Sequence, residues 1–112
     1  MLDNLDDNIR LRHILDAITE IESYTQHILF DDFYTNSMLF NASIRQLEII
    51  GEAANKLSES TIQQNIQIPW AKMIGLRNVL IHNYFGIDDK MIWNVIQINL
   101  PELKKNIIQL LA

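Results

Sequence analysis

The chain contains no cysteine, and it has only three glycines and two prolines among its 112 residues. Without thiols it forms no disulfide, and zinc sites built from cysteine and thiol catalysis are excluded as well. The small number of glycines and prolines, together with a hydrophobic content of 48%, is typical of a folded protein rather than a disordered or low-complexity one.

Positive charge is also scarce. Nine Lys and Arg stand against fourteen Asp and Glu, which gives a net charge of −5. Broad, non-specific binding to nucleic acid needs a basic surface that displaces counterions, so the charge argues against this class of function. The basic residues are scattered along the chain, and any positive site must therefore be assembled by the fold or by two subunits.

Long hydrophobic runs are absent too. No apolar run approaches the length that crosses a membrane, and the first ten residues are polar and acidic rather than basic and then apolar. We therefore expect a cytoplasmic protein with no membrane partner. A length of 112 residues fits one domain, covering residues 1–112, and domains of this size are often helped by oligomerisation.

Apolar residues recur with helical spacing through most of the chain. The spacing predicts four long helices, at Asp6–Tyr24, at Ser37–Leu57, at Pro69–Tyr84 and from a cap at Asp88 or Asp89 to Leu111. Pro101 cannot donate to the carbonyl of Gln97, so it should kink or split the last helix before the amphipathic end at Glu102–Leu111. Gly86 is a plausible stop for the third helix.

Two segments between the helices are rich in polar residues. Gln26–Asn36 is expected to be a connection with one short turn around Asp31–Tyr34. Ser58–Pro69 is expected to be a loop, with Pro69 as the first residue of the next helix. The chain shows no strand-like alternation. These features predict an all-α fold, an antiparallel bundle of four to five helices.

The pattern also predicts two details of packing. In the second helix, Gly51, Ala53 and Ala54 form a patch of small residues. Because Gly costs a helix about 1 kcal/mol relative to Ala, this patch indicates that a neighbouring helix or subunit approaches closely. The inward stripe of the fourth helix is expected to comprise Met91, Ile92, Val95 and Ile98.

Three polar residues stand out in the otherwise apolar third helix: Arg77, His82 and Tyr84, in the pattern R-x4-H-x-Y. Arg77 and His82 are about 140° apart around an ideal helix, so they do not stack as an i, i+4 pair does. Two copies that face each other across a two-fold axis would bring His82 of one subunit to Arg77 of the other. This geometry predicts a homodimer with a composite site at its interface.

The pair suits metal-free cleavage of RNA. Histidine, with an ordinary pKa of about 6.5, can take a proton from the ribose 2′-OH or give one to the leaving 5′-oxygen. A guanidinium stays charged and binds phosphate oxygens. On the residues alone a structural role stays open and is the commoner one, because an isolated Arg or His on such a helix usually pairs with carboxylates or carbonyls.

Several segments together resemble a known family. They are Arg12–Ile18, Arg45–Ala54, Ile68–Trp70, Gly75–Tyr84, Ile87–Asp88 and Leu100–Leu103. In this order and at this spacing they resemble the HepT-type toxins of the HEPN superfamily, which pair with a minimal nucleotidyltransferase antitoxin. The resemblance covers nearly the whole chain.

The resemblance implies a dimeric, metal-independent HEPN ribonuclease without a cofactor, the toxin of a type II- or type VII-like toxin–antitoxin module. It implies that Arg77 and His82 are the catalytic pair and that the substrate is cellular RNA, with tRNA and mRNA both open. It also implies that Tyr84 accepts adenylyl groups. The cognate antitoxin would transfer AMP from ATP to this phenol and so block the cleft.

Three further residues are candidates for supporting roles. Asn78 and Asn83 flank the pair, where they could bind RNA or orient the histidine, or be solvated polar groups of the helix. Arg45 lies in a family-like segment and could contact phosphate, but a salt bridge to Glu48 or Glu52 is the simpler expectation.

The remaining histidines do not indicate a metal site. His13 is expected on a helix surface or in a cleft and His27 in a loop, and neither has partners that suggest metal ligation. An alternative function is a non-catalytic helical subunit that docks a nucleotidyltransferase. The acidic charge favours this alternative, whereas the complete R-x4-H-x-Y pattern favours the enzyme, because a docking module needs neither Arg77 nor His82.

Overall fold

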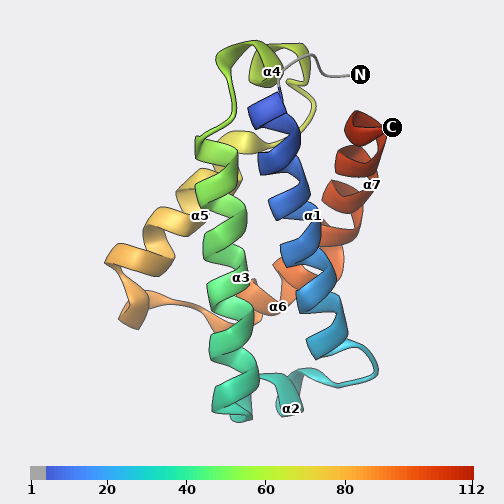
Figure 1. The fold of residues 1–112 in the computed structure, drawn as a ribbon. Helices are drawn as coiled ribbons and strands as arrows, with labels where there is room; N and C mark the ends of the chain where they lie inside the picture. The colour runs from blue at the N-terminus through green and yellow to red at the C-terminus, as the bar shows by residue number, and fades with distance from the viewer. Residues whose placement is uncertain (1–4) are drawn as a thin grey trace.

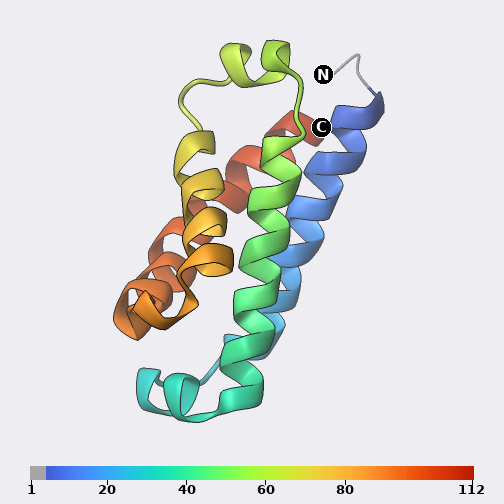
Figure 2. The same ribbon diagram turned by 90° about the vertical axis from the view of Figure 1, so that its left-hand side faces the viewer.

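The computed structural model describes residues 5–112. At its centre α1 (Leu5–Thr25) and α3 (Ser37–Asn55) lie side by side and run in opposite directions (Figure 1). The helix α5 (Trp70–His82) packs along α3, and α7 (Leu100–Leu111) packs along α1 (Figure 2). These residues contain helices and no strand, so the predicted all-α antiparallel bundle is confirmed.

Shorter elements connect the long helices. They are α2 (Phe30–Thr35), α4 (Glu59–Gln64), the 3₁₀ turn η1 (Tyr84–Gly86), α6 (Asp89–Asn94) and the π-helical segment η2 (Val95–Asn99). The side chains of Asn36, Ser58 and Asp88 cap α3, α4 and α6 by accepting hydrogen bonds from backbone N–H groups. None of the helices in residues 5–112 is both long and apolar enough to span a membrane.

The core is centred on the contact between α1 and α3. The inward stripe of α1 is fully buried at Leu11, Ile14, Ile18 and Ile21. At the end of the bundle where α2 lies, the buried ring of Phe33 contacts the rings of Phe40 and Trp93 at centroid distances of 5.4 and 5.0 Å. Since burying an aromatic or aliphatic side chain typically contributes about 1.5–3 kcal/mol, these contacts fix α2 to α3 and α6.

The predicted loop at residues 58–69 was partly wrong, because it contains the helix α4. The hydroxyl oxygen of Ser58 accepts a hydrogen bond from the N–H of Thr61 at 3.2 Å and starts this helix. Thr61 is buried and Ile62 is partly buried, whereas most of the other residues of α4 are exposed. Such a short inward face leaves no clear apolar period in the sequence.

The chain passes from α6 through η2 into α7, and the predicted interruption near Pro101 is confirmed. In η2 the hydrogen bonds span five residues, so the N–H of Leu100 donates to the carbonyl of Val95. The prediction that Ile98 faces inward was wrong, because its side chain is 66% exposed. Ile92 is buried as predicted, and the predicted Met91 and Val95 are partly buried against the core. The wider turn of η2 places Ile96 and Leu100, rather than Ile98, at the buried positions.

The ends of α5 differ slightly from those predicted. Pro69 precedes the helix as its N-cap instead of opening it. The helix ends at His82, and the N–H of Asn83 donates to the carbonyl of Val79 at 2.8 Å. Helix ends commonly vary by one or two residues, but the consequence here is specific: Tyr84 lies in η1, outside the helix, and Gly86 closes η1 rather than α5.

Asp7 ties the start of α1 to the start of α4. Its buried carboxylate accepts hydrogen bonds from the backbone N–H of Ser58 at 2.9 Å and from the hydroxyls of Ser58 and Thr61, each at 2.6 Å. Burial alone would raise the pKa of the Asp7 carboxyl, but these hydrogen bonds outweigh it and hold the pKa below its ordinary value of 3.8. The ionised carboxylate therefore stabilises the fold.

Replacing Asp7 with Ala should lower the free energy of unfolding at pH 7 by about 2–4 kcal/mol, because three donors lose a charged acceptor. A lowered folded-state pKa means that this stabilisation is present above the ordinary value of 3.8 and is lost as the pH falls through the folded-state pKa. Urea unfolding at pH 7 and at a pH below the folded-state pKa of Asp7 measures the effect. The exposed neighbour Asp6 provides the control Asp6→Ala, and equal urea midpoints for the two variants at pH 7 would contradict the prediction.

Candidate functional site

The helix α5 lies very close to α3 at Gly51. A Cβ atom placed on Gly51 would lie 2.2 Å from the Cβ of Arg77 and 2.8 Å from the carbonyl oxygen of Met73. Both atoms belong to the body of α5 rather than to the end of a flexible side chain. The small-residue patch therefore admits a neighbouring helix of the same chain, and the base of the Arg77 side chain rests directly on it.

Adding one methyl group at this contact should destabilise the protein. Gly51→Ala gains up to about 1 kcal/mol of helix propensity, but it must push α5 away from α3, and overpacking of this kind typically costs about 1–3 kcal/mol. Gly75→Ala is the matched control, since a Cβ at Gly75 would have no neighbour within 4 Å. Thermal unfolding should show a lower midpoint for Gly51→Ala and an equal or higher one for Gly75→Ala. A raised midpoint in both variants would contradict the close contact.

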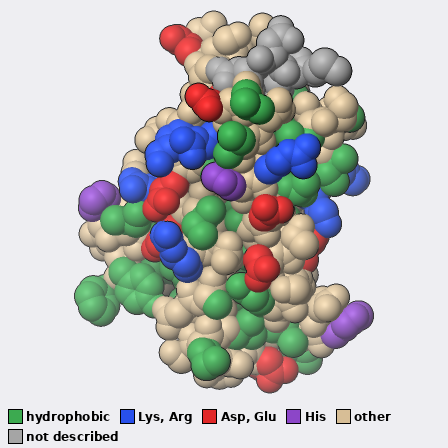
Figure 3. Space-filling model, in the orientation of Figure 1, with side chains coloured by type: hydrophobic (Ala, Val, Ile, Leu, Met, Phe, Trp, Pro, Cys, Tyr) green, Lys and Arg blue, Asp and Glu red, His purple; other side chains and the backbone are tan. Residues whose placement is uncertain are grey.

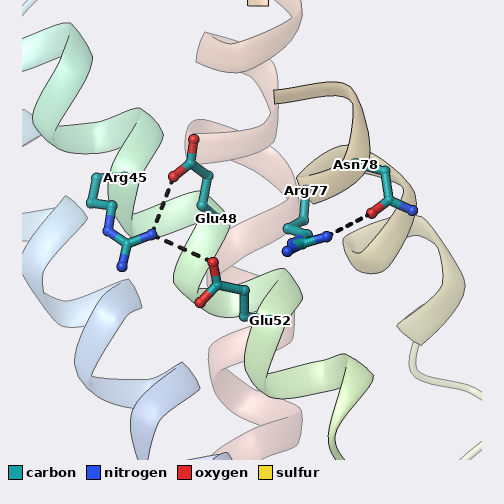
Figure 4. A network of polar contacts seen from close by, with 5 residues as sticks. All are labelled: Arg45, Glu48, Glu52, Arg77 and Asn78. Carbon is teal, nitrogen blue, oxygen red and sulfur yellow. Dashed lines mark hydrogen bonds and ion pairs between the residues drawn. The ribbon is translucent and has the colours of Figure 1, made fainter. Parts of the chain in front are cut away.

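Arg77 is half-buried and is held mainly by packing. Its Nη1 donates a hydrogen bond to Oδ1 of Asn78 at 3.1 Å, whereas its Nε is buried and has no hydrogen-bond partner among residues 5–112. The guanidinium lies between Asn78 on one side and Glu48 and Glu52 on the other (Figure 4). Asn78 thus contacts the arginine rather than the histidine of the predicted pair.

Arg45 forms the salt bridges that the sequence predicted as the simpler expectation. Its Nη1 lies 3.2 Å from Oε1 of Glu48 and 3.5 Å from Oε1 of Glu52 (Figure 4). Exposed ion pairs of this kind contribute about 0–1 kcal/mol, so Arg45 can exchange its partners at little cost. The two carboxylates lie between Arg45 and Arg77, and they offset part of the positive charge on this face of α3.

His82 is the last residue of α5, and its side chain is exposed. Within the described part of the chain no hydrogen bond joins it to Arg77. Tyr84 follows in η1, and its hydroxyl donates to Oδ1 of Asn41 on α3 at 2.5 Å. Sequence reasoning missed Asn41, since nothing near residue 41 signals a partner 43 residues further along the chain.

Exposed hydrophobic side chains surround the end of α5. Val79, Ile81 and Tyr84 are each about 40% exposed, and Phe85 is completely exposed. Figure 3 shows hydrophobic side chains gathered at the edge of the molecule where α5 ends and η1 begins. A cluster of this kind is typical of a surface that meets a partner. His82 at the end of α5 and Tyr84 in η1 thus lie beside an exposed apolar cluster.

No group of three or more His, Cys, Asp or Glu residues within 5–112 is arranged to hold a metal ion. His13 is exposed on α1, as expected for a helix-surface residue. His27 lies in the turn after α1 with a φ of 63°, so it is in the connection that the sequence predicted.

Together these features define an all-α bundle in which one helix presents a cation, an imidazole and, just beyond its end, a phenol. The chain belongs to the ribonuclease HepT-like family, whose model matches residues 14–110. The family predicted from the sequence motifs is therefore confirmed, and the match includes the segments that carry Arg45, Arg77, His82 and Tyr84.

Relatives extend over most of the chain. One RNase candidate of Methanocaldococcus jannaschii is 38% identical over 97 residues, which cover 87% of this chain and 89% of the relative. A probable ribonuclease HepT of Thermococcus cleftensis is 39% identical over 94 residues, which cover 84% of this chain and 86% of the relative. A second M. jannaschii protein, named for a gamma-glutamylcyclotransferase and an RNase, is 40% identical over 106 residues, but these make up only 48% of its length. No solved structure matches the chain.

Proposed function

We propose that this protein is an endoribonuclease, the toxin of a toxin–antitoxin module, and that Arg77 and His82 are its catalytic residues. The observation that carries the proposal is the placement of both side chains on α5 in a chain of the HepT-like ribonuclease family. Arg77 is fixed by its contact with α3, and His82 is exposed at the helix end. A fixed cation and an accessible imidazole are the two groups that RNA cleavage without a metal ion requires.

In this mechanism the ribose 2′-oxygen attacks the adjacent phosphorus. The imidazole of His82 accepts the proton of the 2′-OH, and the imidazolium so formed delivers this proton to the departing 5′-oxygen as the bond from phosphorus to that oxygen breaks. The guanidinium stabilises the additional negative charge on the phosphorane. The products are a 2′,3′-cyclic phosphate and a 5′-hydroxyl.

The site is composite, with Arg77 from one subunit and His82 from its partner. Arg77 and His82 of one chain lie about 140° apart on the helix and share no hydrogen bond. The exposed cluster of Val79, Ile81 and Phe85 adjoins His82 and offers an apolar surface for a second copy. A two-fold axis beside α5 would cover this cluster and bring the two side chains together twice.

The first catalytic prediction concerns single substitutions. Arg77→Ala and His82→Ala should each lower RNA cleavage by about 100-fold or more, since each removes one of the two groups that act in the transition state. Far-UV circular dichroism should remain that of the wild type. Cleavage by the wild type should persist in EDTA and leave 2′,3′-cyclic phosphate ends, and metal-dependent cleavage that leaves 3′-hydroxyl ends would rule this mechanism out.

The composite site predicts complementation between the two inactive variants. If Arg77→Ala and His82→Ala subunits are mixed and exchange freely, about half of the dimers are mixed and each carries one intact site, so about a quarter of the wild-type activity returns. Light scattering at micromolar concentration should report twice 13.1 kDa. If the protein is a strict monomer, both groups of the site must come from one chain. The same conclusion follows if the mixed variants have no activity while the wild type is active.

We further propose that a nucleotidyltransferase antitoxin adenylylates Tyr84. The support is positional, since the phenol is about 40% exposed and lies two residues beyond His82. Its oxygen would attack the α-phosphorus of ATP, the bond to the β-phosphate would break, pyrophosphate would leave, and the phenolic proton would pass to a base of the antitoxin. The added AMP is bulky and negatively charged, and it would keep RNA phosphate away from Arg77.

Replacing Tyr84 with Phe should prevent this modification, because the nucleophilic oxygen is removed while the ring remains. Wild-type protein incubated with the antitoxin and ATP should gain mass in steps of one AMP, and Tyr84→Phe should gain none. Tyr34→Phe is the matched control, since Tyr34 is similarly exposed but lies on α2. Undiminished AMP addition to Tyr84→Phe would place the acceptor elsewhere. If the wild type gains AMP but cleaves no RNA, the alternative function, a non-catalytic subunit that docks a nucleotidyltransferase, would be favoured.

A further inference from the structure

We infer that Asn41 is a positioning residue for the candidate site and that adenylylation acts partly by breaking its hydrogen bond with Tyr84. This inference rests on the proposed function and adds a mechanism of regulation to it. Asn41 lies in the first half of α3, whereas the catalytic candidates lie on α5. The hydrogen bond from the Tyr84 hydroxyl to Asn41 Oδ1, at 2.5 Å, joins α3 to η1, the turn that follows α5.

The orientation of the Asn41 amide is determined by its other contacts. Its Nδ2 donates to the carbonyl oxygen of Ser37 at 2.9 Å and to the Ser37 hydroxyl at 3.2 Å. A carbonyl oxygen can only accept a hydrogen bond, so the NH₂ group must face Ser37. The amide oxygen therefore faces Tyr84, and the phenol is the donor. This bond exists only while the phenolic oxygen carries its hydrogen.

The turn η1 transmits this contact to the end of α5. Within η1 the N–H of Gly86 donates to the carbonyl of Asn83 at 3.0 Å, and the N–H of Ile87 donates to that of Tyr84 at 3.2 Å. Among residues 5–112, no other side-chain hydrogen bond joins η1 to a different helix. Tyr84 is two residues from His82, so the position of its phenol constrains the backbone that ends α5.

Adenylylation removes the donor from this contact. The new oxygen–phosphorus bond replaces the O–H, so Tyr84 can no longer donate to Asn41. The phosphodiester also places a negative charge beside the amide oxygen, which is itself an acceptor, and the two repel each other. The modified Tyr84 therefore no longer ties η1 to α3. Inhibition then has two parts: AMP covers the site, and the end of α5 that carries His82 loses its support.

Two substitutions at Asn41 separate the acceptor from everything else that the residue does. Asn41→Leu and Asn41→Asp both remove the NH₂ group that faces Ser37, but only Asn41→Asp keeps an oxygen that can accept from Tyr84. On unmodified dimeric protein, Asn41→Leu should lower kcat for RNA cleavage about tenfold with little change in KM, as expected when one hydrogen bond that holds the site is lost. Asn41→Asp should retain most of the wild-type kcat.

Amide hydrogen exchange tests the same contact without relying on cleavage. The N–H groups of Gly86 and Ile87 should exchange faster in Asn41→Leu and in AMP-modified wild type than in unmodified wild type or in Asn41→Asp. Unchanged exchange at both amides in Asn41→Leu, with an unchanged melting temperature, would overturn the inference. Equal kcat losses in Asn41→Leu and Asn41→Asp would also overturn it, because the acceptor oxygen would then not matter. A wild type that cleaves no RNA would instead refute the proposed function, and the exchange result would still decide the role of Asn41.

Discussion

The close contact between α3 and α5 at Gly51 determines where the helix that carries Arg77 and His82 lies. Because no side chain stands at Gly51, the base of Arg77 rests on α3 and the carbonyl of Met73 lies beside it. This contact sets the direction in which α5 leaves the bundle, and so it sets the place of His82 at the other end of the helix. Arg77 keeps its position although its buried Nε has no hydrogen-bond partner in residues 5–112. Packing thus holds the base of the Arg77 side chain, and one hydrogen bond to Asn78 holds its guanidinium.

The sequence was sufficient to predict those features of the fold that depend on residues close together along the chain. The apolar period at residues 6–24 predicted an amphipathic helix, and α1 buries Leu11, Ile14, Ile18 and Ile21 fully and Leu15 partly. A cap was predicted at Asp88 or Asp89, and Asp88 provides it. The glycine within α3 indicated a close neighbour, and that neighbour is α5 of the same chain. Motifs in order along the chain predicted the family. The roles of Arg77, His82 and Tyr84 remain predictions, because they depend on a second subunit, RNA and an antitoxin.

What the sequence did not reveal depends on pairs of residues that are far apart along the chain. The bonds of Asp7 to Ser58 and Thr61 span more than 50 residues, and the bond of Tyr84 to Asn41 spans 43. A single polar side chain belongs to no periodic pattern in the sequence, so the sequence does not indicate which distant residue it contacts. The exposed Ile98 has a different cause, since the π-helical segment η2 changes the spacing of inward residues from the one that an α-helix imposes.

The two halves of the site differ in how easily they can move. Shifting Arg77 would mean separating α3 from α5 along a tightly packed seam, which amounts to opening the core. Shifting the backbone beyond His82 disturbs a short turn with an exposed tyrosine and an exposed phenylalanine. A change confined to this second half would therefore alter the end of α5 while the bundle stays folded.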